Sequence, residues 1–289
     1  MTAPKTPNEW TRQPRPDVKA GILFLRRKRP GFDPDWGAEM EKKARAQLVE
    51  HTFDTYIPDV RIVDDASLRQ ALDACREEGC NALVTLQTTM SDGRLAPVLV
   101  QQWDNPVILW ATPEKQEGAM ISACSLVGIH TFASTLRQLD RPFEIVYGMP
   151  GEEDTQSQLE EAVAASYACD CMRNGRAGLV GYHAPGFIDM HADPFVMNRR
   201  LGTQLHHVSI REFLDAMEAC PEKEVEQDVR GVLDSGLPLD GVEESELPTA
   251  SRYYLVMLAL MREESLDALA VRDWTELSDG VGQWPYLAM

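Results

Sequence analysis

Four side chains of the kinds that bind metal ions crowd into the segment GLVGYHAPGFIDMHADP, residues 178–194. His183, Asp189, His191 and Asp193 fall within eleven residues around a Pro-Gly turn. Imidazole and carboxylate groups are common ligands of divalent metal ions, so this segment could in principle form a metal site. However, the spacing matches no established ligand motif, and a loop holds ligands poorly without supporting hydrogen bonds. Asp193 stands directly before a proline, and this pattern predicts the N-cap of a helix.

Further candidate residues lie where apolar runs of the sequence end. Arg27 ends the run AGILFLRR, Thr88 follows the run CNALVTLQ, and Trp110 lies within NPVILWATPE. Ligands of α/β sheets bind beyond the carboxyl ends of the strands, so these three residues are candidates for substrate contact. For each of them, the alternative is a helix cap or a loop hydrogen bond.

Short apolar runs alternate with amphipathic segments along the chain, and this alternation predicts an α/β protein. We expect strands at 20–27, 60–63, 80–90, 105–114, 142–150, 177–182, 203–209 and 267–274. The pattern predicts two doubly wound, Rossmann- or flavodoxin-like domains with parallel sheets. The expected divisions are a flexible tail at 1–17, a first domain at 18–151, and a second at 152–289 that begins with a bridging helix at 152–174.

The composition excludes several classes of function. The chain has 28 basic and 46 acidic residues, a net charge of −18, which argues against nucleic-acid and membrane partners. No run approaches the roughly 20 apolar residues that cross a bilayer, and the polar N-terminus lacks the apolar core of a signal peptide. The six cysteines form neither a disulfide framework nor a zinc pattern. We therefore expect a cytoplasmic protein with reduced thiols.

The chain resembles the L-fucose isomerase-like family, which includes L-arabinose isomerases. The resemblance is carried by four stretches, at 105–114, 123–150, 175–213 and 266–289. The third of them contains a strand, a glycine/proline/phenylalanine turn, a helix, an LG pair and a further strand. The resemblance implies two α/β domains followed by a C-terminal domain. It also implies an aldose–ketose isomerase that moves a proton between C1 and C2 of an open-chain sugar.

The same resemblance implies a cofactor, an assembly and site residues. Family members hold a divalent metal ion, usually Mn²⁺, with two carboxylates and typically a histidine, and we expect a homo-oligomer, either a trimer or a hexamer. His183 and Phe187, in the YHAPGF turn, correspond to residues that face the sugar, and a solvated loop is the alternative. His130 and Arg27 correspond to residues that can reach a neighbouring subunit's site. The alternatives are a core or capping histidine for His130 and a solvated basic loop for Arg27. Glu276 is the candidate catalytic carboxylate, with a helix-start glutamate as its alternative role.

The sequence departs from the family pattern at its C-terminal end. It stops at Met289, before the segment that carries the metal-binding carboxylates in family members. We therefore expect the C-terminal domain and the metal ligands to lie outside this chain, as in a fragment or a split subunit. The alternative is a homologue that has abandoned the chemistry.

Two other functions remain open at the level of sequence. The first is a non-catalytic sugar-binding or regulatory module that keeps a two-lobed α/β cleft. The second is a nucleotide-binding protein, but neither G-x-G-x-x-G nor G-x-x-x-x-G-K-[ST] follows any predicted strand.

Overall fold

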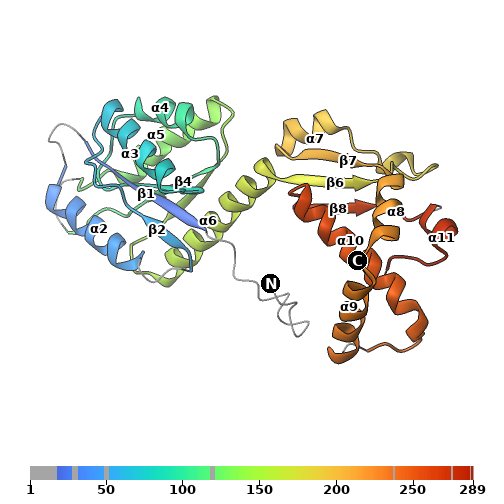
Figure 1. The fold of residues 1–289 in the computed structure, drawn as a ribbon. Helices are drawn as coiled ribbons and strands as arrows, with labels where there is room; N and C mark the ends of the chain where they lie inside the picture. Colours follow the sequence, from blue (N-terminus) through green and yellow to red (C-terminus); the bar gives the residue numbers. More distant parts are fainter. Residues whose placement is uncertain are drawn as a thin grey trace. The chain divides into compact units, whose positions relative to one another are not determined.

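The computed structural model describes residues 18–27, 32–48, 52–117, 121–236, 238–274, 276–286 and 288 (Figure 1). It contains two compact units, and the division between them falls between Cys171 and Met172. We call residues 15–171 the first unit and residues 172–289 the second unit.

Apolar runs form a five-stranded parallel sheet in the first unit. The strand order is β2-β1-β3-β4-β5, with the direction of strand addition reversing between β1 and β3, as in doubly wound folds. The strands are β1 (Lys19–Leu25), β2 (Asp54–Tyr56), β3 (Ala82–Gln87), β4 (Val107–Ala111) and β5 (Phe143–Tyr147). This topology confirms the predicted fold class for the first unit.

Helices cover both faces of the first sheet (Figure 1). Apolar residues of α2 and α6 pack on one face around Ile22 and Trp110, and those of α3, α4 and α5 pack on the other around Leu23 and Leu109. The helices are α2 (Pro34–Gln47), α3 (Asp65–Glu77), α4 (Leu95–Gln102), α5 (Ser125–Gln138) and α6 (Glu153–Asn174). Burial on both faces explains why β1, β3 and β4 read as continuous apolar runs.

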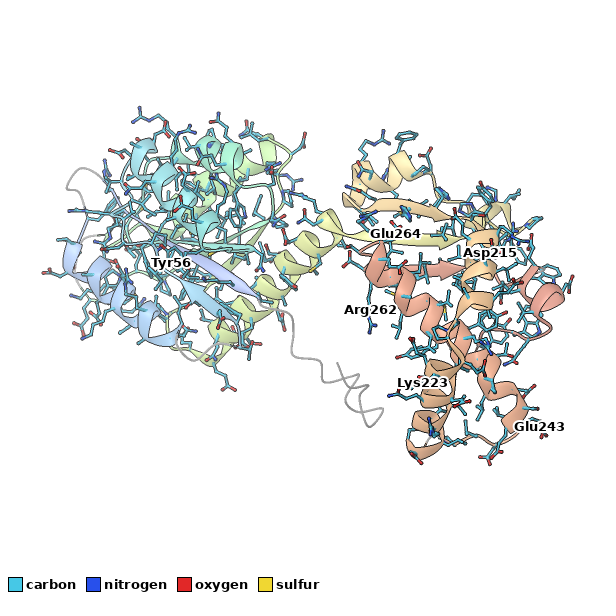
Figure 2. The ribbon with its side chains drawn as sticks, in the orientation of Figure 1. Tyr56, Asp215, Lys223, Glu243, Arg262 and Glu264 are labelled. Atoms are coloured by element: carbon cyan, nitrogen blue, oxygen red, sulfur yellow. The ribbon has the colours of Figure 1, made fainter. Side chains whose placement is uncertain are left out.

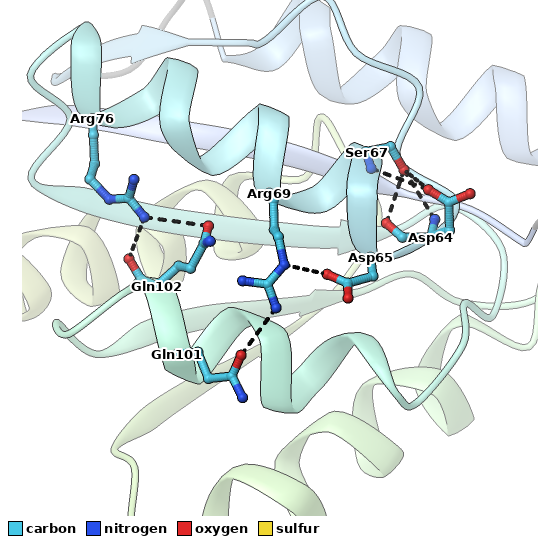
Figure 3. A network of polar contacts seen from close by, with 7 residues as sticks. All are labelled: Asp64, Asp65, Ser67, Arg69, Arg76, Gln101 and Gln102. Carbon is cyan, nitrogen blue, oxygen red and sulfur yellow. Dashed lines mark hydrogen bonds and ion pairs between the residues drawn. The ribbon is translucent and has the colours of Figure 1, made fainter.

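The start of α3 shows how polar residues fix these helices (Figure 3). The Asp64 side chain accepts from the Ser67 backbone N–H at 3.2 Å, and the Ser67 hydroxyl oxygen accepts from the Asp64 N–H at 3.1 Å. This capping box satisfies two N–H groups that the helix itself leaves unpaired. Arg69 then donates to Asp65 on its own helix and to Gln101 on α4, which links the two helices.

The second strand lies earlier than predicted. The sequence predicted a strand at 60–63, whereas β2 covers Asp54–Tyr56. Ile62 makes only an isolated parallel bridge to Leu25. Pro58 lies between these two pairings, and because proline has no N–H it cannot donate to a strand ladder.

A three-stranded parallel sheet of order β7-β6-β8 forms the centre of the second unit. The strands are β6 (Arg176–Val180), β7 (Gln204–Val208) and β8 (Ala268–Val271). The helices are α7 (Pro194–Leu201), α8 (Ile210–Ala219), α9 (Glu222–Asp234), α10 (Leu247–Glu263) and α11 (Glu276–Val281), with 3₁₀ turns η1 (Ile188–Met190) and η2 (Glu244–Glu246). This second parallel α/β sheet confirms the predicted fold class for the second unit.

The core of the second unit lies on one face of its sheet. Val180 and Val208 point to this face and join a cluster with side chains from α8, α10 and α11. Within the cluster, the rings of Phe213 and Tyr253 stack with centroids 6.2 Å apart. Burial raises the pKa of the Tyr253 hydroxyl to about 12. None of the helices in the described ranges is long and apolar enough to span a membrane.

Candidate functional site

A cavity of about 710 Å³ lies at the carboxyl ends of β6 and β8 in the second unit. Its walls include Tyr182, His183 and Phe187, which follow β6, and Arg272 and Trp274, which follow β8. The cavity continues along the sheet over apolar side chains, namely Ala177, Leu179, Ala268 and Ala270. Because side chains alternate along a strand, these residues lie opposite the face that packs on α8 and α10.

Backbone geometry shapes the loop between β6 and α7. Gly181 has a φ of +72° and Gly186 a φ of +89°, values that residues with a Cβ rarely adopt. The Asp193 side chain accepts from the N–H groups of Phe195 and Val196 at 2.8 and 3.0 Å. This confirms the prediction that Asp193 caps a helix.

His183 is held by the backbone of its own loop. Its Nε2 accepts from the Ala192 N–H at 3.2 Å, and its ring centroid lies 4.4 Å from that of His191. A neutral imidazole that accepts at Nε2 carries its proton on Nδ1. His183 therefore has one N–H donor left with which to bind an oxygen of a ligand.

Aromatic rings provide much of the cavity wall. The Phe187 and Trp274 rings meet edge to face with centroids 6.3 Å apart, and about half of each side chain is exposed. The Trp284 and Tyr286 rings stack at 5.5 Å. Partial burial, together with a hydrogen bond to Asp273, raises the pKa of the Tyr286 hydroxyl. Such rings offer flat apolar surfaces next to polar groups that can orient a ligand.

Glu276 lies at the first position of α11, and its carboxylate pairs with Arg272. This is the helix-start position that the sequence offered as the alternative to a catalytic role. The catalytic role of Glu276 stays a prediction. The ion pair also fixes the direction of the Arg272 side chain, and Arg272 is one of the residues that line the cavity.

The described residues do not fit a resident divalent metal ion. No group of three or more His, Cys, Asp or Glu side chains within them is arranged to hold one. In the loop that suggested a metal site, Asp193 is used as a helix cap and His183 accepts a backbone N–H. The arrangement therefore favours a pocket rim over a metal centre in this loop.

The other predicted contact residues belong to the first unit, and two of them serve its packing. Trp110 is fully buried, and its Nε1–H donates to the Gly148 carbonyl at 3.2 Å. Thr88 is also buried, and its hydroxyl donates to the Leu25 carbonyl at 3.3 Å. Trp110 lies within β4 and Thr88 directly follows β3. Both side chains are buried because helices still cover the sheet at these strand ends.

Arg27 and His130 are exposed to solvent. The Arg27 guanidinium lies 5.3 Å from the Phe32 ring centroid. The backbone N–H of Arg27 donates to the Thr89 hydroxyl oxygen at 3.2 Å. Arg27 also borders a second cavity of about 770 Å³, whose other charged lining groups include Asp64. His130 lies on α5 and does not line either cavity.

Several cavity residues were not identified from the sequence. Arg272, Asp273 and Trp274 follow directly after β8, so the rule applied to the strand ends of the first unit would have found them. Trp284 and Tyr286 return to the cavity after α11, and no local sequence pattern indicates that.

The fold and the site thus define a doubly wound α/β protein with an aromatic-lined cavity at the strand ends of its second unit. No protein-family model matches the chain. It is similar to proteins named sulfoquinovose isomerase. Those from Priestia aryabhattai and Priestia megaterium are each 23% identical over 264 residues, which are 91% of this chain and 59% of the relative. The protein of that name from Alkalicoccus urumqiensis is 23% identical over 202 residues, which are 70% of this chain and 45% of the relative.

The chain therefore spans about three fifths of the length of the first two relatives. Among solved structures, a response regulator/GGDEF domain protein of a two-component system is 12% identical and has a TM-score of 0.27, with 92% of this chain and 96% of that one covered. A score this low carries no argument, and the fold assignment rests on the strand order.

Proposed function

We propose that this chain is the sugar-binding part of an aldose–ketose isomerase, and that the cavity of the second unit holds the open-chain sugar. The observation that carries the proposal is the meeting of aromatic rings, a histidine and an arginine at the carboxyl ends of β6 and β8. The similarity to sulfoquinovose isomerases over 91% of the chain supports a sugar as the ligand. Sulfoquinovose, a glucose with a sulfonate in place of the C6 hydroxyl, is the first sugar to test.

Each wall of the cavity has a role in this proposal. Phe187 and Trp274 pack against the C–H faces of the sugar and exclude water from them. The Nδ1–H of His183 donates to a sugar oxygen and orients the chain of carbons. A divalent metal ion, which the resemblance to the L-fucose isomerase type implies, would polarise the carbonyl and would take its ligands from outside the described residues.

The first experiment measures sugar binding by titration calorimetry with the 289-residue chain. We expect saturable binding of sulfoquinovose, weakened about tenfold by Phe187→Ala because a ring that packs on the sugar is lost. Phe195→Ala is the matched control. Phe195 is 84% exposed on α7 and does not line the cavity, so its removal leaves the affinity unchanged. Equal losses in the two variants, or a chain that binds no sugar, would overturn the proposed site.

A non-catalytic sugar-binding module is the second candidate function. The lack of a metal-holding cluster among the described residues favours it. The two functions are separated by incubating the chain with sulfoquinovose and Mn²⁺ and following ketose formation by NMR. Conversion that stops when the metal is chelated supports the isomerase. Saturable binding without conversion shows that this chain alone acts as a sugar-binding module, whether or not a further segment supplies the metal ligands.

The proposal includes assembly into a homo-oligomer, a trimer or a hexamer, in which Arg27 and His130 approach a neighbouring subunit's sugar. Both residues are exposed, as such a role requires. Light scattering after size exclusion gives the mass directly, to be compared with the 32.4 kDa of one chain.

A further inference from the structure

Arg272 occupies a distinctive position at the edge of the cavity. It follows the last residue of β8, and its backbone N–H donates to the Val180 carbonyl at the end of β6 at 3.0 Å. Its side chain is only 12% exposed, and it lines the cavity. A mostly buried cation is thus fixed at the point where the two strands end.

The residue that directly follows the neighbouring strand β6 is Gly181, and it leaves room for this side chain. A Cβ on Gly181 would lie 3.3 Å from the Arg272 Cβ and 3.4 Å from its Nε. Such contacts are tighter than most real ones, and Gly181 also has a positive φ of +72°. Glycine at this position lets the arginine lie across the end of β6.

The guanidinium has more donors than the surrounding protein satisfies. Arginine presents five N–H groups, and the Glu276 carboxylate accepts a hydrogen bond from one guanidinium nitrogen, Nη2. Nε is buried and has no hydrogen-bond partner among the described residues. The guanidinium N–H groups that Glu276 does not occupy can donate to an acceptor from a ligand in the cavity that Arg272 lines.

The neighbouring acidic groups are already engaged. Glu276 pairs with Arg272, and Asp273 accepts a hydrogen bond from the Tyr286 hydroxyl. His183 contributes a donor and no negative charge when it is neutral. The side of the cavity that Arg272 forms therefore suits a ligand oxyanion, which a planar guanidinium binds through two parallel hydrogen bonds.

Resting on the proposed function, we propose that Arg272 binds the anionic substituent of the sugar, and that a sulfonate fits this position. Its oxygens accept from the guanidinium, while the carbon chain of the sugar extends along the wall that Phe187 and Trp274 form. Arg272 then selects sulfonated sugars over neutral ones of the same shape.

The test compares two sugars that differ at one substituent. Sulfoquinovose carries a sulfonate on C6, and quinovose has the same ring with a hydrogen in place of the sulfonate, so that its C6 is a methyl group. Calorimetry with the 289-residue chain gives both affinities. We expect the chain to bind sulfoquinovose at least tenfold more tightly than quinovose. Arg272→Met should reduce this ratio to about one, and Arg272→Lys should lower it at least threefold, because an ammonium lacks the planar pair of donors.

Arg262→Met is the matched control. Arg262 is exposed on α10, labelled in Figure 2, and does not line the cavity, so the ratio should stay as in the unchanged chain. Thermal melting verifies that each variant is folded. If Arg272→Met does not fold, the affinity ratio of Arg272→Lys provides the test.

Three results are distinguishable. Equal binding of the two sugars by the unchanged chain overturns the role of Arg272 and leaves the proposed sugar site standing. A full preference for sulfoquinovose in the lysine and methionine variants also overturns it. Binding of neither sugar removes the proposed function itself, and the role of Arg272 with it.

Discussion

Glu114, just beyond β4, shows how single side chains fix the strand ends of the first unit. Its Oε2 accepts from the Ser122 N–H at 2.7 Å, the Ser122 hydroxyl at 2.6 Å and the Ala123 N–H at 2.9 Å. Partial burial favours the neutral acid, but these hydrogen bonds outweigh it and lower the pKa of the carboxyl below its usual 4.5. The ionised group holds the chain in place just before α5.

This lowered pKa predicts a pH-dependent contribution to stability. A carboxyl with a lower pKa in the folded than in the unfolded state stabilises the fold above its unfolded pKa, and the contribution is lost as the pH falls through the folded pKa. At pH 7, Glu114→Gln should lower the free energy of unfolding by about 1–2 kcal/mol. Urea unfolding of the unchanged protein and of the variant, from pH 7 to 3, should show that their difference in unfolding free energy disappears below about pH 4.5. A difference in unfolding free energy that stays constant down to pH 3 would refute this role of the charge.

At the scale of elements, close packing of α5 on the end of β3 depends on a glycine. A Cβ on Gly128 would lie 2.0 Å from Oε1 of Gln87 and 3.2 Å from Cα of Met90. Gln87 is fully buried, and the same Oε1 accepts from the Ser91 N–H at 2.9 Å. The amide cannot move aside without giving up that hydrogen bond.

Gly128→Ala should therefore destabilise the protein by about 1–3 kcal/mol, the usual range for overpacking. Gly231→Ala is the matched control, because Gly231 is also helical, in α9, and a Cβ there would meet no atom within 4 Å. That change should stabilise the protein by up to about 1 kcal/mol through helix propensity. Chemical unfolding of both variants measures the two effects. The prediction is wrong if the two changes have the same sign.

The elements also show what could be predicted from the sequence. The strands β1, β3 and β4 were predictable because both faces of the sheet are covered, and such strands are apolar throughout. The strand β2 was misplaced because it has only three residues, lies at the edge of the sheet, and has no fully buried side chain. Apolar runs indicate buried strands and miss short edge strands.

At the scale of the whole molecule, the two sheets share the order of three of their strands but differ in what packs on their faces. The order β2-β1-β3 in the first unit corresponds to β7-β6-β8 in the second. Helices pack on both faces of the first sheet, whereas the cavity lies against one face of the second. This difference explains why alanines of β8 are exposed while the strands of the first unit are buried.

The candidate site was predictable only in part for the same reason. His183 and Phe187 were identified from the resemblance of the YHAPGF turn, and both line the cavity. Trp284 and Tyr286 reach it from a segment beyond α11, through packing that no local pattern encodes. Local patterns predict strand ends, whereas the meeting of distant loops depends on the tertiary fold.

The central claim, that the cavity of the second unit binds a sugar, is tested most directly with the tryptophans as reporters. The chain has six, of which Trp274 and Trp284 line the cavity, Trp36, Trp103 and Trp110 belong to the first unit, and Trp10 lies outside the described residues. Fluorotryptophan labelling with ¹⁹F NMR resolves them, and single Trp→Phe variants assign the signals. On titration with sulfoquinovose, we predict that the Trp274 and Trp284 signals shift in a saturable manner. Signals that shift only for Trp36, Trp103 or Trp110, or that do not shift at all, would contradict the account.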